Sequence, residues 1–141
     1  MEAHGLPRMA GRMYAWLLIC HPPEQTAAEI ADALQASRGA ISGSARMLTA
    51  IGLVRRGTRR GDRREYFSVP PGSITRLVES GATAYQGFVD LADDGLDLLR
   101  DRPADQRARL QEVRDVYAFF VREFPSLIAR LRDERTKERA S

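Results

Sequence analysis

Three short stretches in the first half of the chain carry apolar residues at helical spacing. They cover residues 7–20, 26–34 and 37–52. The first opens with a proline, which suits a first helical turn, and stops before a pair of prolines, which cannot continue a helix. The second opens with Thr26 and Glu29 at the spacing of a capping box, and the third begins at a serine and ends at a glycine, both suited to helix ends. The pattern predicts three short helices.

A β-hairpin is predicted to follow the third helix. Residues 53–56 and 65–69 have strand-forming character, and a turn-rich tract containing Gly57, Gly61 and Asp62 separates them. A pair of prolines closes the second strand. Two short helices joined by a brief turn and followed by a hairpin are the arrangement of a winged helix-turn-helix domain.

Two longer apolar stripes occupy the second half of the chain. The first starts at Ile74 and breaks around Pro103, and the second covers 110–131 in alternating steps of three and four residues. These stripes predict two long helices. Pro125 lies inside the second stripe, where it should kink the helix or start a separate final turn. The highly charged end of the chain, 132–141, is expected to fray.

The predicted fold is mainly α with a small β-hairpin. It consists of a winged helix-turn-helix lobe with an N-terminal helix, at residues 1–70, and a long α-helical dimerisation region, at residues 71–141. Amphipathic helices of this length need a partner for their apolar faces, which predicts a homodimer.

Composition adds the broad class of protein. The 141 residues are 43% hydrophobic and 29% charged, as in folded globular proteins, and a single cysteine, Cys20, allows no internal disulfide. No secretory signal pattern is seen, and the longest apolar run, 15–20, is too short to span a bilayer. We expect a cytoplasmic protein that contacts no membrane.

The net charge of +3 is unevenly distributed along the chain. Residues 1–70 carry ten arginines against six acidic residues, whereas residues 71–141 carry twelve basic against thirteen acidic residues. Within ten residues of the hairpin, one acid, Asp62, faces six cations: Arg55, Arg56, Arg59, Arg60, Arg63 and Arg64. Such a cluster repels itself and favours an anionic partner, whose phosphates a flexible cationic tip can follow. The alternative is that the charges only solvate a loop.

The third predicted helix has two unlike faces. At about 100° per residue, Ile41, Ala45 and Leu48 face one way, while arginines, hydroxyls and glycines face the other. Small residues let a helix enter the major groove of DNA, and an arginine can offer two donors to a guanine edge or a phosphate. The alternative is that this face is merely the solvated outer surface of the helix.

The candidate DNA-contact residues therefore come from the second and third helices and from the hairpin. They are Thr26, Ser37, Arg38, Gly39, Ser42, Gly43, Arg46, Thr49, Arg59, Arg60, Asp62, Arg63 and Arg64. Thr26 stands at a helix N-terminus, which can bind a backbone phosphate. We expect Asp62 to orient a neighbouring arginine rather than to touch DNA.

Other classes of function find less support. His4 and His21 are the only histidines, no Cys and His cluster has metal-ligand spacing, and no Gly-rich phosphate loop follows a strand. We therefore expect no catalysis, no metal and no cofactor. A winged-helix protein–protein interaction module is an alternative function. A redox-sensing regulator acting through Cys20 is another, although a lone cysteine on an apolar helix face is more often inert core.

Aromatic residues bear on a further partner, a small-molecule effector of unknown identity. Trp16, Tyr85, Phe88, Tyr117 and Phe120 could line an effector pocket. Their helical spacing instead favours packing in the core or in a dimer.

Several segments give the chain a resemblance to a known family. They are the opening residues Gly5, Leu6, Pro7, Arg8, Ala10, Gly11 and Arg12, the helices at 26–34 and 37–52, and the wing run 61–67. In these segments the chain resembles the MarR family of transcriptional regulators, and more closely its GbsR-like branch. Asp62 and Arg64 match the family's acid and arginine two residues apart. In the second half only the apolar stripes align, so no effector identity carries over, although some relatives answer to osmoprotectants.

The resemblance implies a homodimer whose terminal helices form the dimer domain, with the third helix in the major groove and the wing on the minor groove. Together with the residues, it predicts a sequence-specific double-stranded DNA-binding transcriptional regulator, which we expect to be a repressor. The homodimer is expected to act on an inverted-repeat operator.

Overall fold

The computed structural model describes residues 7–141, so three residues named above, His4, Gly5 and Leu6, lie outside the described residues. The chain divides into two compact units, of which the first ends at Leu77 and the second covers Val78–Ser141. The described residues form five helices and a three-stranded sheet, so the predicted fold class, mainly α with a small β-hairpin, is confirmed.

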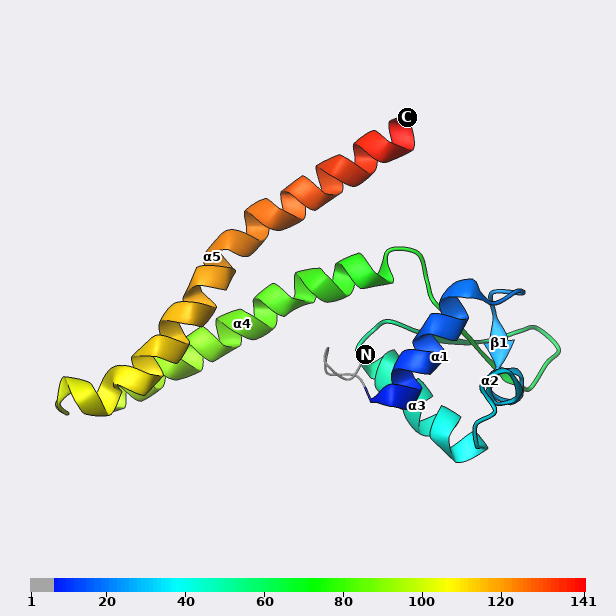
Figure 1. Ribbon diagram of the computed structural model, residues 1–141, viewed down its shortest axis with the longest axis horizontal. Helices are drawn as coiled ribbons and strands as arrows, with labels where there is room; N and C mark the ends of the chain where they lie inside the picture. The colour runs from blue at the N-terminus through cyan, green and yellow to red at the C-terminus, as the bar shows by residue number, and fades with distance from the viewer. Residues whose placement is uncertain (1–6) are drawn as a thin grey trace. The chain divides into compact units, whose positions relative to one another are not determined.

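The first unit, which we call the winged lobe, contains the three predicted short helices. α1 covers Arg8–Ile19, α2 covers Ala27–Leu34 and α3 covers Arg38–Ala50 (Figure 1). α3 packs against both α1 and α2. The helices begin and end where the local signals of the sequence place them.

Side chains at the helix ends explain these boundaries. Thr26 is the N-cap of α2, and the predicted capping box is present, because Glu29 N donates to Thr26 Oγ1 at 3.2 Å and Thr26 N donates to Glu29 Oε1 at 3.2 Å. The Ser37 side chain caps α3 in the same way. Gln35 adopts a left-handed conformation that ends α2, and Gly52, with φ +84°, follows α3 in the conformation that favours glycine.

The core of the winged lobe lies between the three helices. Met13, Ile30, Ile41 and Leu48 are each 0% exposed. Ile41 and Leu48 belong to the apolar face that the sequence predicts for α3, and the third member of that face, Ala45, is also buried. The opposite face of α3 is therefore left to solvent.

A small antiparallel sheet completes the winged lobe. β1 covers Gln25–Thr26, β2 covers Arg55–Thr58 and β3 covers Glu65–Ser68, in the order β1-β3-β2. β2 and β3 form the predicted hairpin, which we call the wing together with the loop between them, and Arg56 pairs with Phe67 across it. β1 was not predicted.

The first strand of the hairpin lies two residues later than the sequence suggested. Leu53 and Val54, expected in this strand, instead follow α3 in a turn, where their N–H groups both donate to Leu48 O. Both side chains are buried in the core, so their apolar character reflects core packing rather than strand alternation. Val69, expected in the second strand, lies just outside β3 and is half-buried.

The two predicted long helices are present. α4 covers Ser73–Leu98 and α5 covers Ala104–Ala140. The first turns of α4 belong to the winged lobe, where Ser73 is buried and Leu77 packs against the core. Within the second unit, Leu110 lies over Gly95, so that the two helices approach closely near the turn that joins them.

Aromatic and charged side chains hold α4 and α5 together. Tyr85 contacts Tyr117 and Phe124 with ring centroids 5.2 and 5.4 Å apart, and Phe88 stacks on Tyr117 at 4.7 Å. Arg114 Nε donates to Asp93 Oδ1 at 2.9 Å. A second ion pair between the helices joins Arg132 and Glu79. The aromatic side chains of α4 and α5 thus pack against one another, although Phe88 and Phe120 remain 48% and 43% exposed.

Two local expectations for α5 do not hold. The helix continues through Pro125, so the alternative of a separate final turn is wrong, although a proline cannot donate the usual backbone hydrogen bond. The charged end does not fray, because the helix extends to Ala140. Its side chains alternate in sign, and Thr136 Oγ1 donates to Arg132 O at 2.9 Å.

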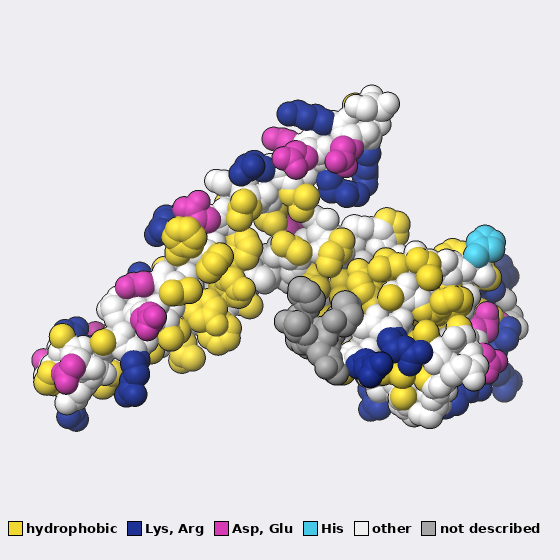
Figure 2. Space-filling view, in the orientation of Figure 1, with side chains coloured by type: hydrophobic (Ala, Val, Ile, Leu, Met, Phe, Trp, Pro, Cys, Tyr) yellow, Lys and Arg dark blue, Asp and Glu magenta, His cyan; other side chains and the backbone are white. Residues whose placement is uncertain are grey.

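The second unit leaves much apolar surface uncovered. Hydrophobic side chains gather along the helical pair in the space-filling view (Figure 2). The exposed large hydrophobic residues of this unit are Val78, Phe88, Leu91, Leu98, Val113, Val116, Phe119, Phe120, Leu127 and Leu131. A stripe of this kind is typical of a surface that meets another protein chain. Among the described residues, no helix is both long and apolar enough to cross a membrane.

Truncation of the buried face of α3 tests this description of the core. Leu48→Ala is expected to lower the free energy of unfolding by about 2–5 kcal/mol, because it opens a cavity at a fully buried position. Ile19→Ala is the matched control, since Ile19 is 76% exposed and lies outside the apolar stripe of the second unit. Urea unfolding of both variants measures the difference, and equal losses would contradict the assigned core.

Candidate nucleic-acid interface

The outward face of α3 is polar and includes two residues without side chains. Arg38, Ser42 and Arg46 are exposed, as the sequence predicts, and Gly39 and Gly43 lie beside them. A Cβ atom built on either glycine would meet no other atom within 4 Å. Packing within this chain therefore gives no reason for glycine at these positions. Glycine inside a helix costs about 1 kcal/mol relative to alanine, so the two residues lower the stability of α3.

Two other α3 candidates are occupied by the helix itself. Ser37 Oγ accepts a hydrogen bond from Ala40 N at 3.1 Å. Thr49 is half-buried, and its hydroxyl donates to Ala45 O. Both side chains can reach a partner only by sharing or giving up these bonds, which distinguishes them from the open arginines.

Thr26 is likewise held in place by the fold. It is 5% exposed, and its hydroxyl donates to Glu29 Oε1 at 3.0 Å while accepting from Glu29 N. The residue ends β1 and caps α2 at the same time. The Thr26 hydroxyl therefore caps α2. An anion at this helix end would be bound by the free N–H groups of the first turn.

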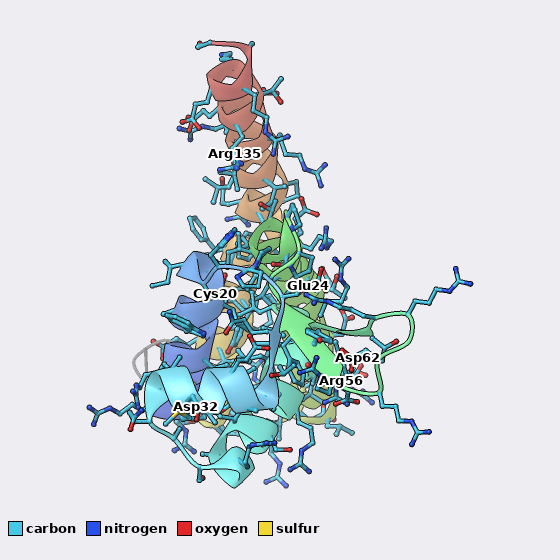
Figure 3. All side chains as sticks on the ribbon, turned by 90° about the vertical axis from the view of Figure 1, so that its right-hand side faces the viewer. Cys20, Glu24, Asp32, Arg56, Asp62 and Arg135 are labelled. Atoms are coloured by element: carbon cyan, nitrogen blue, oxygen red, sulfur yellow. The ribbon has the colours of Figure 1, made fainter. Side chains whose placement is uncertain are left out.

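The loop of the wing projects away from the lobe, as the region around Asp62 in Figure 3 shows. Its four arginines differ in their surroundings. No described side chain pairs with Arg60 or Arg63, which are both exposed. Arg59, by contrast, lies over the Tyr66 ring with its Cζ atom 3.9 Å from the ring centroid, and its Nε is 3.9 Å from Glu24 Oε2.

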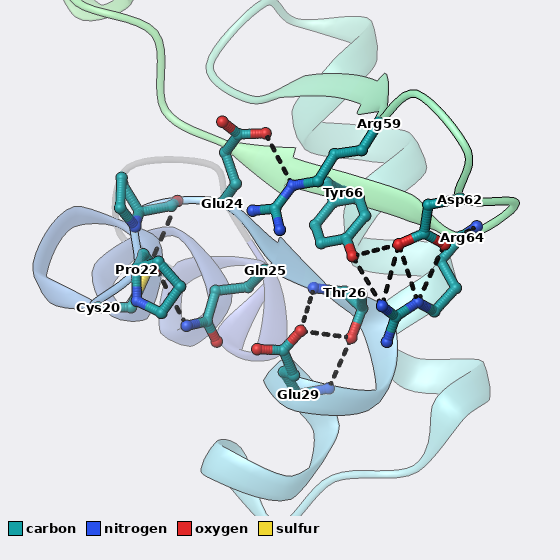
Figure 4. Close-up of polar contacts among 11 residues, drawn as sticks. Cys20, Pro22, Glu24, Gln25, Thr26, Glu29, Arg59, Asp62, Arg64 and Tyr66 are labelled. Atoms are coloured by element: carbon teal, nitrogen blue, oxygen red, sulfur yellow. Dashed lines mark hydrogen bonds and ion pairs between the residues drawn. The ribbon is translucent and has the colours of Figure 1, made fainter.

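Arg64 is the most firmly held arginine of the wing. Its Nε and Nη2 donate to the Asp62 carboxylate at 3.1 and 2.9 Å, and its backbone N–H donates to Asp62 Oδ1 at 2.9 Å (Figure 4). Tyr66 closes the group, because its hydroxyl donates to Asp62 Oδ2 at 2.6 Å and accepts from Arg64 Nη2 at 2.9 Å. The expected role of Asp62, to orient a neighbouring arginine, is thus seen in these contacts.

The charges in this group shift one another's titration. The hydrogen bonds from Arg64 and then from Tyr66 hold the pKa of the Asp62 carboxyl well below its usual range. The same carboxylate raises the pKa of the Tyr66 hydroxyl. A lowered pKa means that the fold favours the ionised Asp62 carboxylate. The contribution of this carboxylate to folding stability is therefore present above the ordinary carboxyl pKa, and it is lost as the pH falls through the lowered pKa, in strong acid. The group therefore keeps its charges throughout the physiological range.

A hollow of about 320 Å³ brings the three predicted elements together. It lies between the start of α2, the outward face of α3 and the base of the wing. Its lining residues are Thr26, Ala27, Ala28, Arg38, Ser42, Ala45, Arg56, Arg64, Glu65 and Phe67. Four of the predicted site residues, from all three elements, therefore border one concave surface, whose charged residues are three arginines and one glutamate.

Three further residues of the lobe were not singled out as site residues. Arg56 lines the hollow, with its Cζ 5.6 Å from the Phe67 ring centroid and its Nε 3.7 Å from Glu65 Oε2. Tyr66 and Glu24 lie beside the wing arginines and contact them. The position of Arg56 in the arginine cluster could have marked it as a site residue. No sequence pattern could have marked Glu24, because it lies 35 residues before Arg59 and contacts it only in the folded chain.

Cys20 offers no activated thiol. Burial is the main cause that raises its pKa, and its Sγ lies 3.8 Å from Leu17 O and 3.7 Å from Pro23 O. A thiol with a raised pKa is a poor nucleophile, which favours the inert interpretation. Trp16, on the same helix, packs against the core and donates from Nε1 to Gln25 Oε1 at 3.1 Å. No group of three or more metal-binding side chains occurs among residues 7–141.

The lobe has the order helix, turn, helix, wing, with a polar helix face beside a basic hairpin, which defines a winged-helix transcription regulator of the DNA-binding class. Residues 72–134 match the family described as MmpR5-like MarR family transcriptional regulator. The HTH-type transcriptional regulator MmpR5 of Mycobacterium tuberculosis is 42% identical over 118 residues, which make up 84% of this chain and 72% of that protein. The crystal structure of a transcriptional regulator matches with TM-score 0.79 and 39% identity, over 94% of this chain and 90% of that chain. The chain belongs to the MmpR5-like MarR family of transcriptional regulators.

The two glycines of α3 allow a test of the open surface. Gly39→Ala and Gly43→Ala are each expected to raise the free energy of unfolding by about 0.5–1 kcal/mol, because alanine has the higher helix propensity and the new methyl group meets no neighbour. Gly95→Ala is the control, since its Cβ would lie 2.8 Å from Leu110 Cδ2 and cannot give the same gain. Denaturant unfolding measures all three, and a loss of stability at Gly39 or Gly43 would show that the surface is not open.

Proposed function

We propose that this regulator binds double-stranded DNA sequence-specifically, as a homodimer on an inverted-repeat operator. The observation that carries the proposal is the hollow at which Arg38 and Ser42 of α3 and Arg64 of the wing border one surface. In this proposal α3 enters the major groove, the wing lies on the minor groove, and the protein acts as a repressor without catalysis.

The exposed face of α3 supports its role as the reading element. Arg38 and Arg46 are exposed, and an arginine can bond the O6 and N7 atoms of guanine with two donors. Gly39 and Gly43 add no side chain, so the backbone of α3 can come close to the bases. The stabilised glycine variants should accordingly bind the operator more weakly than the parent protein does, because each added methyl group occupies this gap.

The wing supports the minor-groove contact. Arg60 and Arg63 are exposed and can follow phosphates, whose contacts supply affinity without sequence information. Arg64 is held in a defined orientation, which suits an arginine that enters a narrow minor groove. Thr26, Ser37 and Thr49 are assigned a lesser part, because their hydroxyls are already bonded within the fold.

The homodimer proposal rests on the uncovered apolar stripe of α4 and α5. Phe119 is 48% exposed and Leu91 is 68% exposed, although both belong to long amphipathic helices. A second copy of the same helices would cover such a stripe by two-fold symmetry. The finer resemblance to the GbsR-like branch, the cytoplasmic location and a small-molecule effector stay predictions.

The alternative of a protein–protein interaction module is less well supported. Such a module has no need of a basic wing or of counterion release from DNA. The redox alternative is also weaker, since burial raises the Cys20 pKa.

Substitutions in α3 and in the wing should fail in different ways. Arg38→Ala or Arg46→Ala should cost about 1–3 kcal/mol on a duplex selected from a random pool and much less on random DNA. Replacing Arg59, Arg60 and Arg63 together by Ala should weaken both duplexes alike. It should also flatten the slope of log affinity against log salt by about 0.9 for each phosphate that the wing no longer neutralises. Binding isotherms at several salt concentrations measure both effects.

A matched control removes the same charge elsewhere. Arg102, Arg109 and Arg130 are exposed arginines of the second unit, and replacing all three by Ala should leave the salt slope nearly unchanged. If the wing variant keeps the parent's affinity and salt slope, the arginine cluster does not contact DNA and only solvates the loop.

The oligomeric state and the operator symmetry should agree. Sedimentation is expected to give about twice the chain mass of 15.8 kDa. Footprinting on the selected duplex should show an inverted repeat with half-site centres roughly 10 base pairs, one helical turn, apart. A folded protein that stays monomeric at tens of micromolar and protects one asymmetric element would refute the dimer.

A further inference from the structure

One side chain of the wing, Tyr66, contacts two of its arginines through different parts of the same residue. We propose that Tyr66 is a positioning residue for DNA recognition, whose hydroxyl fixes the Arg64 guanidinium for minor-groove readout while its ring holds Arg59. This inference rests on the proposed function, since it assigns a specificity-determining role within the same interface.

Tyr66 is anchored more firmly than the arginines it contacts. It is 4% exposed and lies in β3, the middle strand of the sheet. Its backbone pairs with Thr26 of β1 on one side and with Gly57 of β2 on the other. The hydroxyl therefore stands at a position set by the whole sheet, whereas Asp62 and Arg64 belong to the loop that precedes β3.

The hydroxyl closes a ring of hydrogen bonds around the end of Arg64. It donates to Asp62 Oδ2 at 2.6 Å and accepts from Arg64 Nη2 at 2.9 Å, while Nη2 also donates to Asp62 Oδ2 at 2.9 Å. Nε donates to the same carboxylate. The N–H groups of Nε and Nη2 are thus engaged, and no described residue accepts from Nη1. The fold leaves the two donors of Nη1 to face an external acceptor.

The ring lies closer to Arg59 than to Arg64, whose Cζ atom is 5.6 Å from the ring centroid. Arg59 lies 3.9 Å from this centroid, close enough for a cation–π contact, and Glu24, from the segment before β1, forms an ion pair with the same guanidinium. Phenylalanine would keep the contact between ring and guanidinium, because it keeps the ring. A substitution at this one position can therefore separate the hydroxyl's effect on Arg64 from the ring's effect on Arg59.

Fixing Arg64 before DNA arrives affects selectivity more than attraction. An arginine that is already ordered loses little side-chain freedom on entering the minor groove, and its two donors already point in one direction. Its charge is the same whether or not the hydroxyl is present, so attraction to phosphates does not change. Loss of the hydroxyl should therefore weaken the preference among sequences and leave the salt dependence intact.

Tyr66→Phe tests the proposal on the full chain. The probes are a duplex selected from a random pool, the same duplex with A·T pairs under the wing changed to G·C, and a random duplex. The affinity ratio between the first two should fall about 3- to 10-fold, the range for ordering one long side chain on binding. Affinity for the random duplex and the salt slope should stay at the parent's values. By NMR, the Arg64 Nε–H proton should exchange faster with solvent.

Three variants serve as comparisons. Tyr14→Phe makes the same chemical change at a half-buried position of α1 and should leave the ratio unchanged. Asp62→Asn removes the carboxylate that the hydroxyl bonds, and should lower the ratio even if Tyr66→Phe folds poorly. Arg64→Lys keeps the charge but lacks the planar guanidinium. It should therefore lower the affinity ratio between the first two duplexes and retain most of the affinity for random DNA.

The outcomes distinguish the inference from the proposed function. If the parent protein fails to prefer the selected duplex over random DNA, the proposed function is wrong. If the parent shows this preference and Tyr66→Phe keeps the parent's ratio, the role of Tyr66 is refuted while the function stands. A variant that lowers the melting temperature and weakens all three duplexes by one factor would also overturn the inference, because Tyr66 would then act only on stability.

Discussion

The burial of one face of α3 is the constraint on which the rest of the winged lobe depends. Ile41, Ala45 and Leu48 close the core against α1 and α2, and this fixes which residues of α3 remain outside. The helix then ends at Gly52, and Leu53 and Val54 return to the same core. Because the chain is anchored there, β2 starts beside α3 and the wing emerges next to its open face.

The arginines of the wing are alike in sequence and unlike in structure. Six cations so close together repel one another, and the fold offsets part of this repulsion with acids that come from three places: Asp62 in the loop, Glu65 in β3 and Glu24 before β1. Arg64 and Arg59 are thereby oriented, whereas Arg60 and Arg63 stay open to solvent. Exposed ion pairs of this kind add little stability. Their effect is to set where each guanidinium points.

Both units carry features that do not serve the stability of a single chain. In the winged lobe, Gly39 and Gly43 weaken α3 without any packing reason within the chain. In the second unit, the aromatic side chains between α4 and α5 are only partly covered, and Phe120 remains 43% exposed. Each feature lowers the stability of a single chain, and the proposed DNA contact and homodimer would give each of them a partner surface.

The sequence by itself determined the elements whose signals are local. The capping box of Thr26 and Glu29, the glycine after α3 and the apolar periods placed the helices, because each signal acts within one or two turns. The sequence also led us to expect that Asp62 orients a neighbouring arginine, and the family resemblance pointed to Arg64. Local rules failed at the end of α5, where the charged segment continues as helix.

Only the tertiary structure decided the rest. β1 has two residues and no period, and it exists because β3, some 40 residues later, offers it backbone partners. Leu53 and Val54 have strand-forming side chains, but in the fold they follow α3 in a turn and are buried in the core. The contacts of Tyr66 and Glu24 with Arg59 join residues that no motif connects. Such contacts depend on where folded segments meet. The pattern of apolar and polar residues along the chain does not specify this, because it indicates whether a residue is buried or exposed and not which residue it contacts.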